Sequence, residues 1–130
     1  MLIGGSHAES DAVSRIQGHS RHPLISLIGR APLLTFAALA RRCELFVGND
    51  NGAAHIAAAV ATPSVVLFGP SDPAEWAPIG PSVVTLYKGL DCSPCYRSGC
   101  RRGNESCMQQ ITVDEVWEAA ERIRRGMARS

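Results

Sequence analysis

The stretch Leu45–Phe68, with the sequence LFVGNDNGAAHIAAAVATPSVVLF, decides the fold of this chain. A short apolar run lies at each of its ends, and an alanine-rich segment of helical length lies between them. A strand followed by a helix and a second strand is typical of an α/β domain with a mainly parallel sheet.

The rest of the chain continues this alternation, and Gly or Pro marks each switch between apolar runs and helix-like stretches. We therefore predict an α/β fold with a Rossmann-like parallel sheet. The expected strands are Leu2–Ile3, Leu24–Leu27, Leu45–Val47, Ser64–Phe68 and Ser82–Tyr87, and the expected helices are Ala8–Gln17, Pro32–Arg42, Ala53–Val60 and Val113–Gly126. The last helix has the clearest start, because Thr112 and Glu115 have the spacing of a capping box.

Length and composition narrow the possible functions. The chain has 130 residues, of which 45% are hydrophobic, and this suits one domain over residues 1–130. Thirteen basic and twelve acidic side chains give a net charge of +1, which excludes non-specific polyanion binding as the main function. The apolar runs are shorter than the roughly 20 residues of a membrane span, and there is no signal peptide, so we expect a cytoplasmic protein.

The polar turn before the alanine-rich helix is a candidate ligand site, because open α/β folds bind ligands at this edge of the sheet. The helix start offers unpaired N–H groups and a positive dipole end, which suit a phosphate. Gly52 lets the backbone approach a diphosphate, Asn51 caps the helix or donates its amide, and His55 lies on the first turn. Asp50 suits a sugar hydroxyl or a backbone N–H. An ordinary polar turn with an N-cap and a satisfied histidine contains the same residues, so spacing alone leaves both interpretations open.

Two further landmarks occur in order along the chain. Gly4-Gly5 is followed by Glu9, and Pro63–Pro73 brings an apolar strand to a Gly-Pro turn. Together with Asp50–His55 these segments resemble the donor-binding half of glycosyltransferase family 9, the heptosyltransferases that transfer heptose from ADP-heptose to the lipopolysaccharide core. The resemblance runs from about Leu2 to Arg124 and implies the C-terminal half of a GT-B fold.

The resemblance implies a role for each matching residue. Asp50, Asn51, Gly52 and His55 would surround the diphosphate and heptose, with Asn51 replacing the family's usual hydroxyl residue. Glu9 would bind the ribose hydroxyls, although an ordinary first-turn glutamate explains it equally well. Ala31 would lie near the adenine and act through its backbone.

The resemblance also implies parts that cannot be matched to this sequence. In the family, the general base and the acceptor surface belong to an N-terminal half, and a phosphate-binding lysine precedes the matched region. We therefore expect an N-terminally incomplete domain, assign no catalytic residue, and expect the chain alone to be inactive. The parent enzyme would need no cofactor, would bind an ADP-sugar and a lipopolysaccharide-core acceptor but no nucleic acid, and would work at the inner face of the cytoplasmic membrane.

Four cysteines cluster in the segment 92–107, at Cys92, Cys95, Cys100 and Cys107. Their spacing is compatible with a small structural zinc site, and a metal-free thiol loop is the alternative.

Two other functions remain open besides the transferase: a non-catalytic nucleotide-binding α/β module and a zinc-stabilised interaction module.

Overall fold

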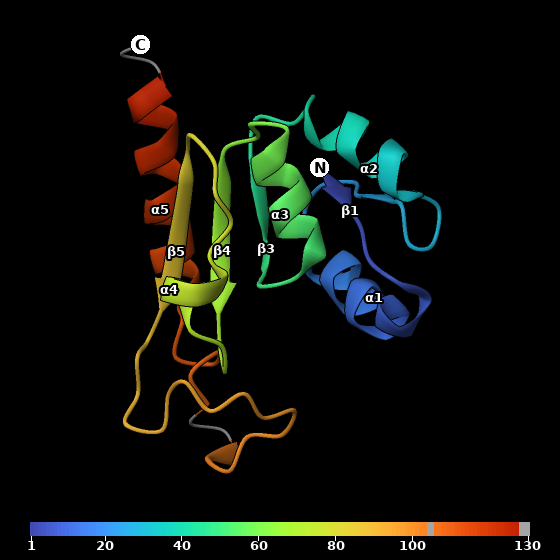
Figure 1. Cartoon of the computed structure of the whole chain (residues 1–130). Helices are drawn as coiled ribbons and strands as arrows, with labels where there is room; N and C mark the ends of the chain where they lie inside the picture. Colours follow the sequence, from blue (N-terminus) through green and yellow to red (C-terminus); the bar gives the residue numbers. More distant parts are fainter. Residues whose placement is uncertain (104–105, 128–130) are drawn as a thin grey trace. The chain divides into compact units, whose positions relative to one another are not determined.

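The structure of the chain, a computed structural model, describes residues 1–103 and 106–127. Its elements are shown in Figure 1. In chain order they are β1 (Leu2–Ile3), a 3-10 helix (His7–Glu9), α1 (Ser10–His19), β2 (Ile25–Ser26), α2 (Leu33–Ala40), β3 (Phe46–Asn49), α3 (Gly52–Ala59), β4 (Ser64–Phe68), α4 (Pro73–Trp76), β5 (Val83–Tyr87) and α5 (Val113–Met127).

The chain divides into two compact units, Met1–Leu39 and Ala40–Ser130, where the sequence predicts one domain over residues 1–130. Among the described residues, each unit has a sheet of its own, with two strands in the first and three in the second. All the strand pairs are parallel, so the predicted α/β class with parallel sheets is confirmed.

The first unit pairs β1 with β2. The pairing continues beyond the strand ends, because Leu27 N–H donates to the Ile3 carbonyl at 2.9 Å and Gly29 N–H donates to the Gly5 carbonyl at 3.0 Å. The loops that follow the two strands therefore meet at one edge of this sheet.

The second unit has the strand order β3-β4-β5, with β4 in the centre. Val65 of β4 packs against Ala119 of α5. Val66 and Phe68 pack against Ala54 of α3. Because alternate residues of a strand face opposite sides of the sheet, α3 and α5 cover opposite faces (Figure 1).

Helix α5 begins at the predicted capping box. Thr112 N–H donates to Glu115 Oε2 at 2.7 Å, and Glu115 N–H donates to Thr112 Oγ1 at 3.2 Å. The apolar side chains of the helix are only partly buried, since Val113 is 84% exposed and Trp117 is 66% exposed. The helix packs on the sheet through Ala119 and its neighbours, and Val113 and Trp117 lie away from this contact.

The predicted helix Ala8–Gln17 begins in the structure as the 3-10 helix His7–Glu9 and continues as α1 (Ser10–His19). The short helix α4 was not expected from the sequence. Helix α4 is capped by Asp72, whose Oδ1 accepts the Ala74 N–H at 2.8 Å, and Pro73 follows at its first position. An N-cap residue followed by proline is a recognised helix start, so a local signal for α4 was present.

Candidate functional site

The turn between β3 and α3 lies at the carboxyl edge of the second sheet. Asp50 N–H donates to the Leu67 carbonyl at 3.0 Å and so extends the pairing of β3 with β4. Asp50 Oδ2 accepts a hydrogen bond from Ser71 Oγ at 2.5 Å. Ser71 belongs to the loop after β4, so side chains join the ends of two neighbouring strands. Sequence reasoning did not select Ser71 for the site; its place in the Gly-Pro turn that follows β4 was the available signal.

Asn51 caps α3, as predicted. Its Oδ1 accepts the N–H groups of Ala53 at 2.9 Å and of Ala54 at 3.3 Å. The extended backbone of Asn51 allows this side chain to fold over the helix start. The expectation of several unpaired N–H groups is therefore corrected, because the cap satisfies two of them. The Gly52 N–H has no acceptor in the part of the chain that the structure describes.

Gly52 is the first residue of α3 and is exposed. A Cβ built on Gly52 meets no atom within 4 Å, and its φ lies outside the left-handed region. Neither packing nor backbone conformation requires glycine at this position. The open space is therefore available to a molecule that approaches the helix start.

His55 lies on the first turn of α3 and is exposed. The buried face of this helix consists of Ala54, Ala57 and Ala58. The His55 imidazole has no hydrogen-bond partner within residues 1–103 and 106–127. The interpretation of His55 as a satisfied histidine under a loop is therefore not supported, and its imidazole is available to a ligand.

In the first unit, Glu9 forms a capping box with Ser6. Glu9 Oε2 accepts the Ser6 N–H at 2.7 Å and the Ser6 hydroxyl at 2.9 Å. These hydrogen bonds, first from the backbone and then from the hydroxyl, lower the pKa of Glu9. A Cβ built on Gly5 would lie 2.9 Å from Glu9 Oε2, so the second glycine of the turn permits this close approach. Glu9 Oε1 accepts no hydrogen bond from the described residues.

Ala31 lies half-buried in the loop between β2 and α2. Gly29, two positions before Ala31, has a φ of +60°, and a Cβ there would overlap the His7 ring. Because Gly29 N–H also donates to Gly5, the loops that contain Glu9 and Ala31 are joined at the edge of the first sheet. The predicted site residues thus form two groups, one in each unit.

The cysteine-rich segment contains no α-helix or strand within its described residues, as predicted. It is docked on the turn between β4 and α4, because the Pro70 carbonyl accepts the N–H groups of Cys95 at 2.9 Å and Tyr96 at 3.0 Å. The Tyr96 hydroxyl also donates to Glu75 Oε2 at 2.9 Å, which raises the pKa of Tyr96. In Figure 1 the segment lies below the sheet, beyond the ends of β4 and β5.

The described part of the cysteine-rich segment does not bring its thiols together at one point. All four clustered cysteines are free. Among residues 1–103 and 106–127, no group of three or more His, Cys, Asp or Glu side chains could hold a metal ion. Cys100 Sγ instead accepts the Arg102 N–H at 3.4 Å, within a tight turn. The structural zinc site at Cys92, Cys95, Cys100 and Cys107 therefore stays a prediction.

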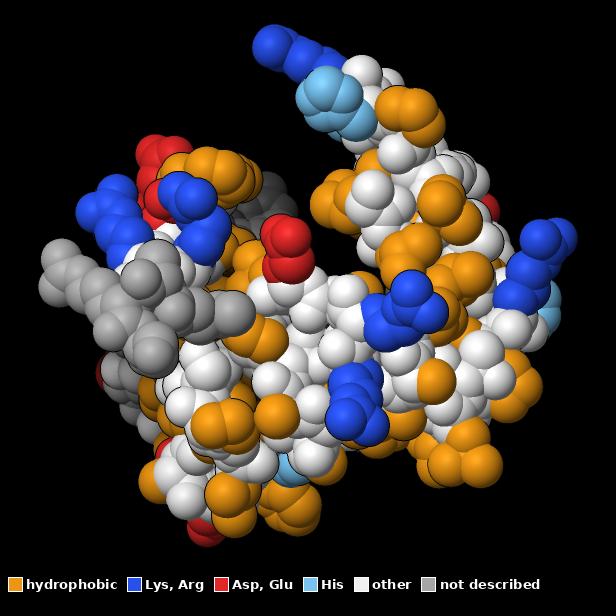
Figure 2. Space-filling view, turned by 90° about the horizontal axis from the view of Figure 1, so that it is seen from above, with side chains coloured by type: hydrophobic (Ala, Val, Ile, Leu, Met, Phe, Trp, Pro, Cys, Tyr) orange, Lys and Arg blue, Asp and Glu red, His pale blue; other side chains and the backbone are white. Residues whose placement is uncertain are grey.

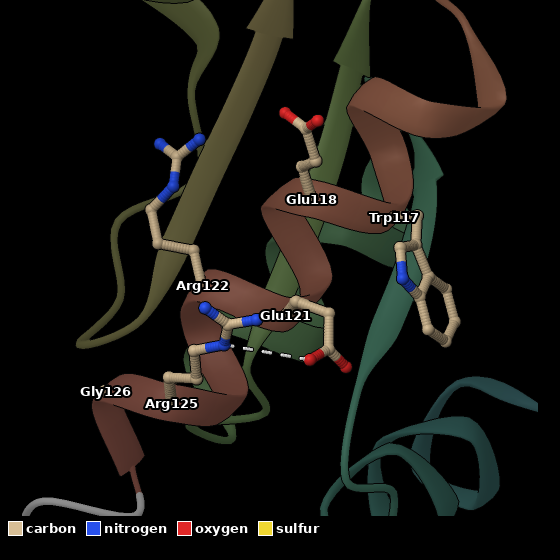
Figure 3. A pocket seen from close by; sticks show the side chains of 6 residues that line it. All are labelled: Trp117, Glu118, Glu121, Arg122, Arg125 and Gly126. Carbon is tan, nitrogen blue, oxygen red and sulfur yellow. Dashed lines mark ion pairs between the residues drawn. The ribbon is translucent and has the colours of Figure 1, made fainter.

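Helix α5 borders a groove that the sequence did not indicate (Figure 3). Its lining consists of Trp117, Glu118, Glu121, Arg122, Arg125 and Gly126. Glu121 Oε2 forms ion pairs with Arg124 at 2.9 Å and with Arg125 at 3.9 Å, so part of the charge here is compensated locally. Because α5 and α3 cover opposite faces of the sheet, this groove is separate from the turn at Asp50–His55.

The surface has no single dominant charge. Figure 2 shows basic side chains dispersed over the visible face among hydrophobic and acidic ones. This agrees with the near-zero net charge of the sequence. Within the described part of the chain, no helix has the length and apolar character that a membrane span requires.

Sequence comparison relates the chain to known enzymes. The model of glycosyltransferase family 9 (heptosyltransferase) matches residues 1–105. Lipopolysaccharide heptosyltransferase 3 of Escherichia coli is 32% identical over 107 residues, which cover 82% of this chain and 31% of that protein. Lipopolysaccharide heptosyltransferase 1 of Pseudomonas aeruginosa is 36% identical over 103 residues, which cover 76% of this chain and 27% of that protein. The chain thus spans about a third of the length of these relatives.

The fold is also that of solved structures of this family. The structure of E. coli ADP-heptose lps heptosyltransferase II superimposes with a TM-score of 0.79 at 24% identity, over 98% of this chain and 37% of that one. A glycosyltransferase family 9 structure from Veillonella parvula gives a TM-score of 0.78 at 24% identity, over 94% of this chain and 35% of that one. The family match over residues 1–105 and the shared parallel α/β fold lead to one conclusion: the chain belongs to glycosyltransferase family 9.

Proposed function

We propose that this chain is the donor-binding part of an enzyme that transfers heptose from ADP-heptose to an acceptor of the lipopolysaccharide core. Family membership and the names of the similar proteins support the reaction class. One observation carries the proposal for the site: the space in front of Gly52 is open, and the exposed His55 lies on the same first helical turn.

In this proposal the diphosphate of the donor lies at the start of α3. The Gly52 N–H donates to a phosphate oxygen, and the helix dipole favours the negative charge. His55 donates a second hydrogen bond from the same turn. The Oδ1 atom of Asn51 is occupied by the cap, so Asn51 acts toward the donor through its amide nitrogen.

The remaining contacts divide between the sugar and the nucleoside. Asp50 accepts a hydrogen bond from a heptose hydroxyl. Glu9 accepts from the ribose through Oε1, because Ser6 already occupies Oε2. Ala31 lies near the adenine through its backbone. No further cofactor takes part.

We propose that the general base and the acceptor surface belong to a part of the protein outside these 130 residues. A transfer reaction requires that donor and acceptor are held together in one geometry. This chain therefore supplies donor affinity, and no catalytic residue is assigned within it. The protein would act in the cytoplasm at the inner face of the membrane, where peripheral contact brings it to its acceptor.

Calorimetric titration of the chain with ADP and with ADP-heptose tests this proposal. We expect ADP-heptose to bind more tightly than ADP, and we expect Gly52→Val and His55→Ala to weaken both ligands. The proposal would be contradicted if the chain bound no adenine nucleotide even after the N-terminal half of a family relative had been added. Equal affinity for ADP and ADP-heptose would instead favour a nucleotide-binding module without sugar chemistry.

A further inference from the structure

The hydrogen bond between Ser71 and Asp50 joins two loops that lie 21 positions apart in the sequence. We infer that Ser71 is a positioning residue, which fixes the Asp50 carboxylate in the orientation that recognises the sugar of the donor. The inference rests on the proposed function, because it assumes that Asp50 faces a sugar hydroxyl.

Asp50 is held at two points. Its N–H donates to the Leu67 carbonyl at 3.0 Å, which fixes the backbone at the end of β3. Its Oδ2 accepts the Ser71 hydroxyl at 2.5 Å in a half-buried environment. Within the described residues no other donor or basic side chain reaches this carboxylate. Oδ1 is therefore the atom that remains for a ligand hydroxyl.

Ser71 is itself held in place from both sides. Asp72, the next residue, caps α4 through the hydrogen bond from the Ala74 N–H. The preceding Pro70 accepts two backbone N–H groups, from Cys95 and Tyr96. The turn that carries the Ser71 hydroxyl is therefore clamped between a capped helix and the cysteine-rich segment, which gives that segment a supporting role at the site.

A fixed orientation of the Asp50 carboxylate affects binding of the donor's sugar more than binding of its diphosphate. A hydrogen bond to a charged group is stronger than one between neutral groups, and a prearranged acceptor loses less conformational freedom on binding. Without Ser71, the Asp50 side chain samples other rotamers and must be ordered by the ligand. The diphosphate contacts at Gly52 do not depend on this ordering. Loss of Ser71 should therefore reduce the preference for ADP-heptose over ADP.

The test is the ratio of the Kd for ADP to the Kd for ADP-heptose, measured by calorimetry on the chain. We expect Ser71→Ala to reduce this ratio about fivefold to tenfold, because the ligand must then order the Asp50 side chain on binding, while the Kd for ADP stays unchanged. Ser71→Thr keeps a hydroxyl at the same place and should restore the ratio. Ser20→Ala is the control, because it removes a hydroxyl whose 2.7 Å hydrogen bond to His22 lies outside the site.

A double-mutant cycle separates action through Asp50 from direct contact with the donor. We expect Ser71→Ala to have no further effect in an Asp50→Ala background. An additive effect, or an unchanged ratio in the single variant, would overturn the inference and leave the proposed function intact. Failure of the wild-type chain to bind ADP-heptose, both alone and with the N-terminal half of a family relative, would overturn the proposed function, and the inference with it. Thermal unfolding of each variant identifies any that fail to fold. If Ser71→Ala fails to fold, Ser71→Thr decides the question: the inference requires that this variant keep the wild-type ratio of the Kd for ADP to the Kd for ADP-heptose.

Discussion

The substitution Gly52→Ala should raise stability and lower donor affinity at the same time. A Cβ at position 52 meets no protein atom within 4 Å, and the backbone φ is one that alanine adopts without strain. Replacing glycine by alanine at such a position restricts the unfolded chain and stabilises the fold by about 0.4–1 kcal/mol. For a chain of this size we expect an increase in Tm of about 1–4 °C.

The effect on binding has the opposite sign. In the proposed complex, a phosphate oxygen lies about 2.9 Å from the Gly52 nitrogen, the usual distance for such a hydrogen bond. The added methyl group occupies part of the volume next to this N–H and displaces the phosphate. We expect the Kd for ADP-heptose to rise at least about tenfold, which corresponds to about 1.4 kcal/mol.

Urea unfolding followed by circular dichroism measures the first effect, and calorimetric titration measures the second. Gly126→Ala is the matched control, because Gly126 is also helical, lies in the same unit and leaves its Cβ position open (Figure 3). The control should gain stability and keep its affinity. If Gly52→Ala retains wild-type affinity, the close approach of a diphosphate is refuted. If it is less stable than the wild type, the fold itself requires glycine there.

Three further predictions concern the cap, an ion pair and the cysteines. Asn51→Ala removes the two capping hydrogen bonds and should destabilise the chain by about 1 kcal/mol in urea unfolding, whereas Asn51→Ser should retain most of the stability. The pKa of Glu115 is lowered from 4.5 to about 2, first by the hydrogen bond from Lys88, so the stability that it contributes is present above pH 4.5 and is lost as the pH falls toward 2. In Glu115→Gln the urea midpoint of unfolding should depend less on pH across that window. A pH dependence equal to that of the wild type would count against the ion pair with Lys88. Cys92→Ser and Cys100→Ser should leave the Tm within about 1 °C of the wild-type value, since surface substitutions rarely change stability by more than about 0.5 kcal/mol. Stoichiometric zinc in freshly purified protein, together with a large loss of Tm in either variant, would contradict the arrangement of free thiols in the structure.

Local signals account for the elements that the sequence predicted well. The strand Ser64–Phe68 matches the structure at both ends, because it is a short apolar run bounded by Pro63 and Gly69. The start of α5 was equally clear, since a capping box acts between residues three positions apart. The Asn51 cap is of the same kind.

Long-range contacts account for what the sequence did not indicate. The hydrogen bond from Ser71 to Asp50 depends on the register of β3 against β4, which no pattern of residue types specifies. The same applies to Pro70, because its partners are backbone N–H groups that any residue other than proline possesses. Strand β1 was expected from a two-residue apolar stub, and β2 (Ile25–Ser26) is shorter than the predicted strand Leu24–Leu27; so short a run does not specify which strand it pairs with.

The double acceptor at Pro70 has a consequence for hydrogen–deuterium exchange. Amides in a segment without regular secondary structure usually exchange with solvent quickly. The N–H groups of Cys95 and Tyr96 are exceptions, because both are engaged by one carbonyl oxygen at 2.9 and 3.0 Å. Slow exchange at these two neighbouring amides would therefore report directly whether the cysteine-rich segment contacts the turn between β4 and α4 in solution.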